Sequence, residues 1–180
     1  MSNPKQTTAL SCLLVLLPLL GNAQTCKPQS ISATTPTARF TSSNSGWMLD
    51  KYTGLMWKTC SEGQVWNSGT HACDYTVDTF TWQGALQQAQ KLNAIGGFAK
   101  FKDWRIPNQK ELYTLVEIQC YSPAINLKVF PNTGTNAFVW SSSASPDYNP
   151  PAWIVGFSDG SFSLQDKSYS GQVRLVRAGQ

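Results

Sequence analysis

The stretch DWRIPNQKEL, residues 103–112, places acidic, aromatic, basic, apolar and amide side chains next to one another. Pro107 cannot continue a helix toward its N-terminal side, whereas Asn108 is a residue type that caps helices. Glu111 follows Asn108 at the three-residue spacing of a capping box. The stretch therefore predicts a helix that starts at Asn108.

Apolar residues continue from this start at helical spacing. They are Leu112, Leu115, Val116 and Ile118, and they predict a buried stripe on a helix that ends near Cys120. Asp103 and Arg105 precede the helix, and we expect them to pair locally or to bond to loop backbone. Every residue type in the stretch then has a structural role.

A second amphipathic helix is predicted on the N-terminal side, in TWQGALQQAQKLNAIGG, residues 81–97. Thr81 is the expected N-cap, and Gly96 with Gly97 is the expected stop. The expected buried face consists of Trp82, Leu86, Ala89 and Leu92.

The rest of the chain has the texture of short strands and turns. GWMLDKYTGLMW, residues 46–57, predicts a hairpin with its turn at 51–54, preceded by a short strand near Arg39 and Phe40. Four more strands are expected in segments 138–143, 152–157, 160–166 and 171–179, with an Asp-Gly turn joining the second and third. We predict an α+β fold: a single compact, disulfide-bridged domain with two helices and an antiparallel sheet.

The first 23 residues have the features of a secretory signal peptide. One lysine precedes an apolar run from Ala9 to Leu20, and small residues lead to a cleavage site after Ala23. The run is shorter than the roughly 20 apolar residues that a membrane-spanning helix needs. We therefore predict a protein without membrane insertion that is secreted, periplasmic or at the cell surface, with an extended segment at 24–38 and a domain at 39–180.

Four cysteines remain after the predicted cleavage removes Cys12. An even number in an exported chain favours disulfides over metal or redox chemistry. Cys60 and Cys73 flank a polar, glycine-bearing loop with little else to hold it, so we predict that they pair. Cys26 and Cys120 then form the second bridge, which should stabilise the fold by roughly 3–5 kcal/mol in the chain-entropy model.

The charge balance argues against nucleic-acid binding. Lys and Arg number 14 against 10 Asp and Glu, and removal of Lys5 with the signal peptide leaves an excess of three. Such an excess is too small for a nucleic-acid footprint but allows a local basic patch for an acidic ligand. Seven tryptophans, six tyrosines and eight phenylalanines are typical of sandwich-like and carbohydrate-binding folds, and of ordinary cores as well.

Seven motifs occur in an order that resembles the bacterial Lcl C-terminal domain family, also called DUF1566. They are TGLMW (53–57), TWQGAL (81–86), DWRIPNQKEL (103–112), YSPAINLKVFPNT (121–133), FVWSSS (138–143), AWIVGF (152–157) and VRLVR (173–177). The resemblance runs from about Arg39 to Arg177. Leu175 stands where many relatives have cysteine.

The resemblance implies a compact α+β module related to C-type-lectin-like and formylglycine-generating-enzyme folds, on secreted or surface proteins. In the collagen-like adhesin that gives the family its name, the domain is a trimeric head that binds sulfated glycosaminoglycans. This chain has no Gly-X-Y stalk, which is the element that would enforce three chains. Trimerisation and the adhesin role therefore do not follow from the resemblance alone.

Basic residues are the candidate ligand-binding groups. They are Lys100, Lys102, Arg105, Lys110, Arg174 and Arg177. Arg105 beside Trp104 is the candidate clamp for a ligand anion. Arg174 and Arg177 are three residues apart, so a regular strand would place them on opposite faces.

Enzyme and metal roles have weaker support. The single histidine, His71, lies in the cysteine-bounded loop, and no serine or cysteine has a nucleophile motif around it. Calcium would require clustered oxygen ligands, for which only the surroundings of Asp147 or Asp159 come into question. We expect no catalysis, cofactor or metal.

Two hypotheses of function follow from these patterns, and a third, an unrecognised enzyme, ranks below both. The first is an exported binding module, adhesin-like in character, that recognises acidic or sulfated polysaccharide. The second is a structural or interaction subunit that contacts another envelope protein without a glycan.

Overall fold

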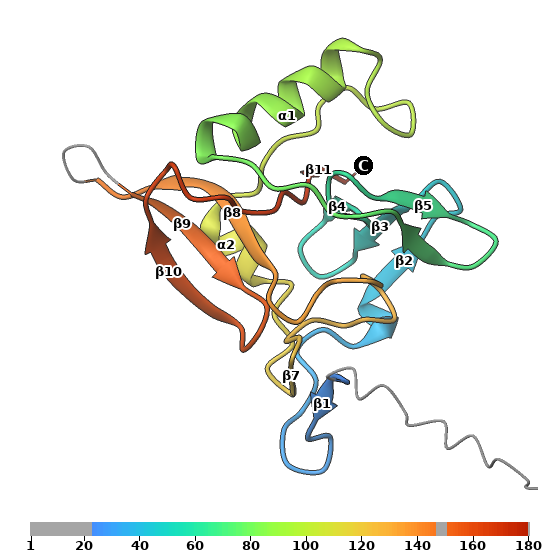
Figure 1. Ribbon diagram of the computed structural model, residues 1–180. Coiled ribbons are helices and arrows are strands. Elements are labelled where there is room, and N and C mark those ends of the chain that lie inside the picture. The colour runs from blue at the N-terminus through green and yellow to red at the C-terminus, as the bar shows by residue number, and fades with distance from the viewer. Residues whose placement is uncertain (1–22, 147–150, 180) are drawn as a thin grey trace, which may run out of the picture.

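The computed structural model describes residues 23–146 and 151–179, and it confirms the predicted α+β class. Two helices, α1 (Trp82–Ala94) and α2 (Gln109–Tyr113), accompany four small antiparallel sheets (Figure 1). The predicted signal peptide, apart from Ala23, and the candidate Asp147 lie outside the described residues. No helix in the described part combines the length and apolar character needed to cross a bilayer.

The first main sheet contains four strands in the order β11-β4-β3-β2. They are β2 (Phe40–Ser42), β3 (Trp47–Asp50), β4 (Leu55–Lys58) and β11 (Val176–Ala178). The predicted hairpin at 46–57 is confirmed as β3 and β4, with Asp50 opposite Leu55 at the turn. The C-terminal strand β11 pairs with β4 and forms one edge of the sheet, and β2 forms the other edge.

The second main sheet has the order β10-β9-β8. Its strands are β8 (Phe138–Ala144), β9 (Ala152–Gly156) and β10 (Ser161–Gln165). The predicted Asp-Gly turn connects β9 to β10, and Gly160 has a φ of 80°. A Cβ at Gly160 would also lie 2.5 Å from Val116 Cγ1, so glycine is required here.

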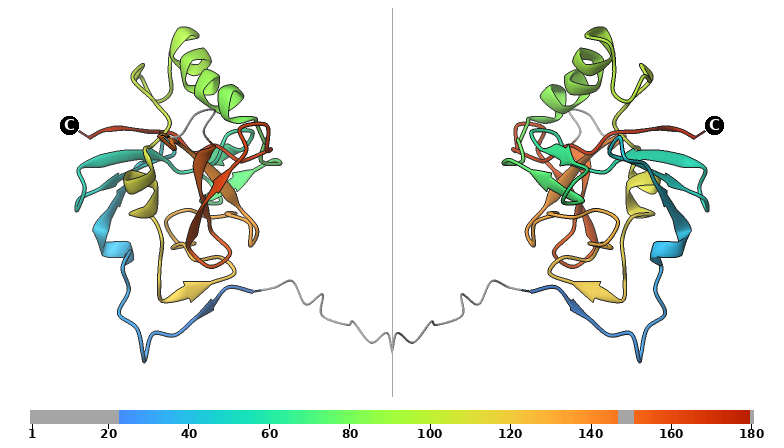
Figure 2. Two further views of the ribbon diagram at one scale, coloured as in Figure 1. Left: turned by 90° about the vertical axis from the view of Figure 1, so that its left-hand side faces the viewer. Right: turned by 90° about the vertical axis from the view of Figure 1, so that its right-hand side faces the viewer.

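Both predicted disulfides are confirmed. Cys26–Cys120 joins β1 (Thr25–Cys26) to β7 (Cys120–Tyr121) and ties the N-terminal segment to the domain (Figure 2). Cys60–Cys73 closes the local loop. The expectation that this loop is held by little besides its bridge is wrong, because a hairpin of β5 (Val65–Asn67) and β6 (Ala72–Asp74) forms inside it.

Helix α1 has the predicted boundaries, and its predicted face packs on the second core: Ala89 is buried, together with Ala85, which was not predicted, whereas Trp82, Leu86 and Leu92 are half-buried. The Thr81 hydroxyl accepts a hydrogen bond from the Gly84 amide, which confirms the N-cap. Beyond Ala94 the Gly97 amide donates to the Leu92 carbonyl at 2.8 Å, and Gly97 has a φ of 80°. A Cβ on Gly97 would lie 1.8 Å from the Phe101 carbonyl oxygen, so the chain can turn this tightly only with glycine.

Helix α2 starts as predicted but ends early. The Asn108 side chain accepts from the Glu111 amide, and the Glu111 carboxylate accepts from the Asn108 amide, which confirms the capping box. The prediction of a helix to Cys120 is wrong. The Thr114 hydroxyl donates to the Glu111 carbonyl, Val116 bridges to Ile125, and Ile118 is 53% exposed.

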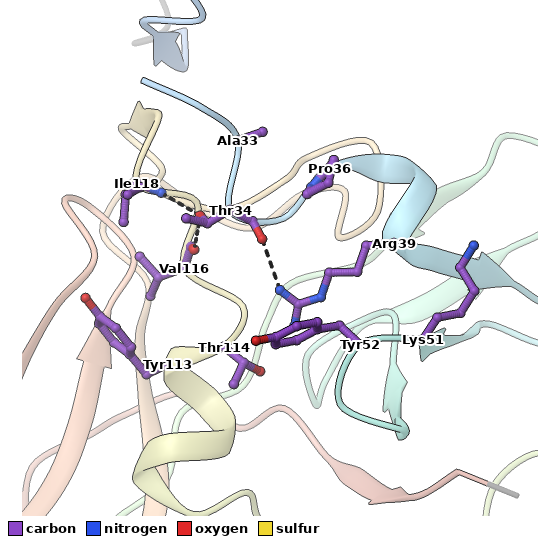
Figure 3. A pocket seen from close by; sticks show the side chains of 10 residues that line it. All are labelled: Ala33, Thr34, Pro36, Arg39, Lys51, Tyr52, Tyr113, Thr114, Val116 and Ile118. Atoms are coloured by element: carbon purple, nitrogen blue, oxygen red, sulfur yellow. Dashed lines mark hydrogen bonds between the residues drawn. The ribbon is translucent and has the colours of Figure 1, made fainter. Parts of the chain in front are cut away.

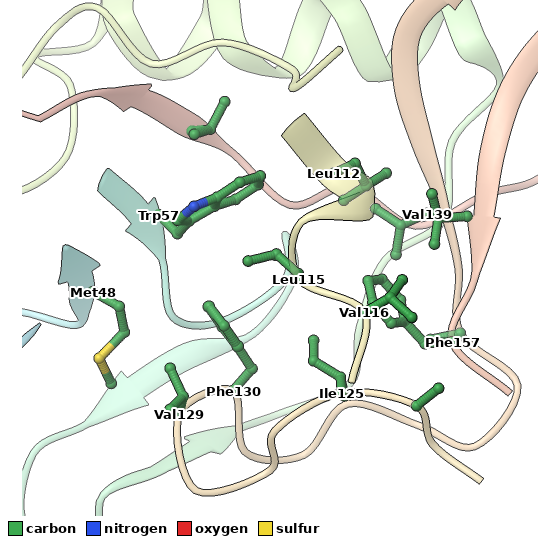
Figure 4. Packing of buried hydrophobic residues seen from close by; sticks show 14 of the residues in the cluster. Met48, Trp57, Leu112, Leu115, Val116, Ile125, Val129, Phe130, Val139 and Phe157 are labelled. Carbon is green, nitrogen blue, oxygen red and sulfur yellow. The ribbon is translucent and has the colours of Figure 1, made fainter. Parts of the chain in front are cut away.

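The larger hydrophobic core lies between the two main sheets (Figure 4). Leu112, Leu115 and Val116, from α2 and the turn after it, point into it alongside Trp57 and Phe130. A second core packs α1 against the opposite face of β8 and β9, through residues such as Ala85, Trp104, Trp140 and Ile154. Helix α2 and the turn after it therefore pack against both sheets. This packing fixes the position of the surface around them.

Removal of the Asn108 cap of α2 should destabilise the folded protein modestly. We expect Asn108→Ala to lower the free energy of unfolding by about 1 kcal/mol, because the Glu111 amide loses its acceptor. Chemical denaturation measures the change, with the exposed neighbour Lys110→Ala as the control. An effect no larger than that of the control would show that the cap contributes nothing to stability.

Candidate functional site

The charged residues of the stretch 103–112 hold the fold together. Arg105 donates to the Ile106 carbonyl of the loop, as one predicted alternative has it, but the predicted pair of Asp103 with Arg105 is absent. Asp103 binds Arg177, with Nε to Oδ1 at 2.7 Å, and does not pair with Arg105. Arg105 instead forms a two-pronged pair with Glu111, both contacts at 2.7 Å. The Arg177 hydrogen bonds lower the pKa of Asp103, and the Arg105 hydrogen bonds lower the pKa of Glu111 and raise that of Arg105.

Arg174 lies inside the protein. Its guanidinium donates to the carbonyls of Lys58 and Thr59 and to the hydroxyls of Ser61 and Thr133. Burial lowers its pKa to about 10, although the charge of Glu62 opposes the shift. Because the side chain is fully enclosed, it is not available to a ligand at the surface.

Arg177 is buried in a different environment. Its guanidinium carbon lies 3.9 Å from the centre of the Phe101 ring, and its Nε and Nη2 donate to Asp103. Arg174 precedes β11 and Arg177 lies on it, and the two contact different parts of the interior. Neither contributes to an exposed basic patch.

The three predicted lysines are exposed. Lys100 lies at the tip of a two-residue turn between Phe98 and Phe101, and Lys102 follows that turn. Lys110 lies on α2. Within residues 23–146 and 151–179 no ion pair involves any of them.

Among the predicted ligand residues, Arg105 lies in a groove. The groove runs between α1 and the start of α2, has a volume of about 500 Å³, and includes Gln90, Asn93 and Asn108. Both arms of the Arg105 guanidinium are engaged by Glu111, so a ligand anion would have to displace a carboxylate. This arrangement favours the structural interpretation of Arg105.

A larger groove of about 710 Å³ lies on another face (Figure 3). We call it the tyrosine groove, and its lining consists of Ala33, Thr34, Pro36, Arg39, Lys51, Tyr52, Tyr113, Thr114, Val116 and Ile118. Three segments distant in sequence form it: the N-terminal segment, the β3–β4 turn, and the end of α2 with the turn that follows. The sequence prediction named none of its polar or aromatic residues as ligand groups.

The N-terminal wall of the tyrosine groove is held by a buried carboxylate. Glu117 accepts hydrogen bonds from the amides of Thr34, Thr35 and Gln119 and from both threonine hydroxyls. The single proton of the Thr34 hydroxyl is shared between Glu117, at 3.2 Å, and the Val116 carbonyl, at 2.8 Å, and its oxygen accepts from the Ile118 amide. These bonds fix the extended segment at Thr34 and Thr35 to the turn after α2, so the groove is preformed.

Arg39 joins the N-terminal segment of the groove to the end of β3. Its Nε and Nη2 donate to the Asp50 carboxylate, and its Nη1 donates to the Thr34 carbonyl. Burial raises the pKa of Asp50, but hydrogen bonds from Arg39, Thr53 and Tyr52 outweigh it and leave the pKa below its ordinary value. The charge of Arg39 is therefore compensated, and its guanidinium lies 5.0 Å from the centre of the Tyr52 ring.

Lys51 supplies a positive charge without such compensation. It is exposed at the groove, and no described residue forms an ion pair with it. Its neighbour Tyr52 is 83% exposed, and Tyr113, on the other side of the groove, is 42% exposed. The groove thus combines two accessible aromatic rings, an apolar floor and one free cation.

An aromatic in a polar turn was a usable signal in the sequence. Tyr52 occupies the turn of the predicted hairpin, where small and polar residues are usual. Tyr113 offered no comparable signal, because an aromatic one position after a predicted core residue fits any amphipathic helix. The sequence does not show that Tyr52 and Tyr113 line one groove, since 61 positions separate them.

The candidate metal and catalytic residues remain dispersed. Among the residues that the structure describes, no three His, Cys, Asp or Glu side chains gather as a metal site would require. The Asp159 carboxylate accepts from the Ser161 amide in the β9–β10 turn. His71 lies at the tip of the β5–β6 hairpin with its ring against Trp66.

Comparison with protein families decides the identity of the domain. A family model described as the Lcl C-terminal domain matches residues 46–177, well over half of the chain. The chain belongs to the Lcl C-terminal domain family. The resemblance drawn from the seven motifs is thereby confirmed.

No curated protein matches this Lcl C-terminal domain significantly. The family match includes both main sheets except β2 and the last residue of β11, and it includes both helices. It also includes Lys51, Tyr52 and Tyr113, whereas residues 33–39 of the groove precede it. The relation to C-type-lectin-like folds implied by the resemblance stays a prediction.

Proposed function

We propose that this Lcl C-terminal domain is an exported binding module whose tyrosine groove holds acidic or sulfated polysaccharide. The observation that supports it most is the pairing of Tyr52 and Tyr113 across one groove with Lys51 at its edge. Binding sites for small ligands combine an apolar lining with a few placed polar groups. This groove has that composition.

Each part of the groove corresponds to a part of such a ligand. The tyrosine rings offer flat apolar faces for the carbon-bound hydrogens of a sugar ring, and their hydroxyls offer hydrogen bonds. Lys51 can bind a sulfate or carboxylate as a charge-assisted contact. Arg39 is held by Asp50, so its role is to fix Tyr52 in place.

Export is part of the proposal. Two disulfides are typical of proteins in oxidising compartments, which agrees with the predicted signal peptide. The groove holds no serine, cysteine, histidine or carboxylate that could act as nucleophile or base, so the proposal involves binding without catalysis.

Heparin retention tests the proposal. We expect Lys51→Ala and Tyr52→Ala each to weaken binding about tenfold, the loss of about 1.4 kcal/mol of contact. The matched controls are Lys91→Ala and Tyr75→Ala, which remove an exposed lysine and an exposed tyrosine outside the groove. Retention should fall with modest salt, because the contact is at the surface.

Two outcomes would contradict the proposal. If the unmodified protein flows through the heparin column at low salt, an acidic glycan is excluded as its ligand. The hypothesis of a structural or interaction subunit is then the better one. Loss of retention in Arg105→Ala, with the melting temperature intact, would move the site to the groove beside α1.

A further inference from the structure

The charges at the tyrosine groove balance one another. Two cations, Arg39 and Lys51, belong to its lining. Two carboxylates contact that lining from inside the protein, because Asp50 binds Arg39 and Glu117 binds Thr34. Burial raises the pKa of both carboxyls, but hydrogen bonds outweigh it and leave both pKa values below their ordinary range, so both groups are charged at neutral pH. The two negative charges therefore offset the two positive ones.

One of the two cations is already fully bound by the protein. Nε and Nη2 of Arg39 donate to Asp50, its Nη1 donates to the Thr34 carbonyl, and its side chain is 11% exposed. Lys51 is exposed, and within residues 23–146 and 151–179 no acid pairs with it. Lys51 is thus the cation of the described lining that a ligand anion can reach.

Backbone amides cannot take the place of further cations. The Thr34 amide donates to Glu117, the Tyr52 amide to Asp50, and the Ile118 amide to the Thr34 hydroxyl. Other amides of the lining also donate within the protein, namely those of Arg39, Lys51, Thr114 and Val116. An anion placed on the apolar floor would lose its water without gaining these donors, which costs free energy.

We infer that the ligand of the tyrosine groove is a glycan with one negative charge per disaccharide, in which an unsulfated uronic acid alternates with a neutral sugar. This inference rests on the proposed function and narrows its ligand class. The carboxylate of one repeat pairs with Lys51, and the rings of Tyr52 and Tyr113 contact apolar faces of the sugars. Additional sulfates would meet the apolar floor and the charges of Asp50 and Glu117.

Calorimetric titration of the full protein, with both native disulfides formed, compares three hexasaccharides of equal length. The first is from hyaluronan, with one carboxylate per disaccharide, the second is from heparin, which is densely sulfated, and the third is from uncharged chitin. We expect the hyaluronan chain to bind at least as tightly as the heparin chain at physiological salt. It should bind about tenfold more tightly than the chitin chain, because of one charge-assisted contact.

The salt dependence counts the ionic contacts. One contact between a lysine and a polyanion releases about one counterion, so log Kd of the hyaluronan chain should rise with log salt at a slope of about 1. Lys51→Gln should flatten this slope and weaken hyaluronan binding to the level of chitin. Lys91→Gln, which removes an exposed lysine outside the groove, should leave slope and affinity unchanged.

A variant with an added charge tests the same balance in the opposite direction. Ile118 belongs to the groove lining and is 53% exposed, so Ile118→Lys can place its ammonium in water beside the groove. We expect heparin affinity to rise about tenfold and hyaluronan affinity to rise less. Ile95→Lys, at an 83% exposed position after α1, should change neither. Melting curves establish that each variant is folded.

The possible failures separate this inference from the proposed function. Tighter binding of the heparin chain than of the hyaluronan chain to the unmodified protein, or a slope of about 2 or more, would overturn the inference alone. Equal binding of the chitin and hyaluronan chains, or no binding of any chain, would overturn the proposed function as well.

Discussion

Replacing Trp104 with alanine should lower the free energy of unfolding by about 3–5 kcal/mol, the range for truncation of a buried large aromatic. Trp104 is enclosed in the second core, and its indole Nε1 donates to the Phe98 carbonyl at 3.0 Å. Its backbone exchanges two hydrogen bonds with the Asn93 side chain. Loss of the indole would therefore open a cavity where α1 meets the loop that follows it.

Chemical denaturation of Trp104→Ala and Trp104→Phe measures the effect. The phenylalanine variant retains most of the apolar volume and should cost less than half as much. Heparin retention of the alanine variant, measured where it is still folded, should match that of the unmodified protein. A loss of retention without a loss of stability would place Trp104 at a ligand site and contradict its structural role.

Glu117→Gln should lower the free energy of unfolding by about 2–4 kcal/mol, the second large effect, because an amide cannot accept all the hydrogen bonds that the carboxylate accepts. Burial disfavours the charged form, but hydrogen bonds from Thr35, Thr34 and Gln119 outweigh it and lower the pKa from its ordinary 4.5. The matched control is Asp74→Asn, which replaces an exposed carboxylate that accepts a hydrogen bond from Asn67 and should cost about 0.5 kcal/mol or less.

The lowered pKa of Glu117 makes the stability of the protein depend on pH. In the unfolded chain Glu117 takes up its proton near 4.5, and in the folded protein only at lower pH. Its contribution to stability is therefore complete above 4.5 and is lost as the pH falls through the folded value. Unfolding measured between pH 7 and 3 should show a shallower acid loss in Glu117→Gln. An identical slope in both proteins would contradict the role of this carboxylate.

Local signals predicted much of the fold. Asn108 and Glu111 determine a helix start by their own hydrogen bonds, so the capping box could be read from spacing alone. Thr81 did the same for α1, and the cysteine pairing followed from the short loop between Cys60 and Cys73. These features depend on neighbours in sequence, which is why their prediction succeeded.

The end of α2 depended on contacts that the sequence does not display. Leu112, Leu115 and Val116 are buried as a helix would bury them, yet the chain leaves the helix after Tyr113. Tertiary pairing of Val116 with Ile125 replaces the helical hydrogen bonds there. An apolar spacing that fits a helix fits such a turn equally well over so short a segment.

The environment of the candidate ligand residues also depends on tertiary contacts that the sequence does not display. Charged side chains are mostly exposed in proteins, so the sequence predicts Arg174 and Arg177 as surface groups, whereas the structure encloses both. The tyrosine groove is assembled from three separate segments that tertiary structure brings together. Its residues become candidates only when those segments are seen side by side (Figure 3).

If acidic polysaccharide binds in the tyrosine groove, an NMR titration with a heparin-derived oligosaccharide will locate the contact there. Amide shifts on the labelled protein locate the contact without any substitution. Binding in the tyrosine groove predicts saturable shifts at Thr34, Tyr52 and Thr114, with little change at Lys100 and Lys102. Shifts confined to 100–105, or none at low salt, would contradict it.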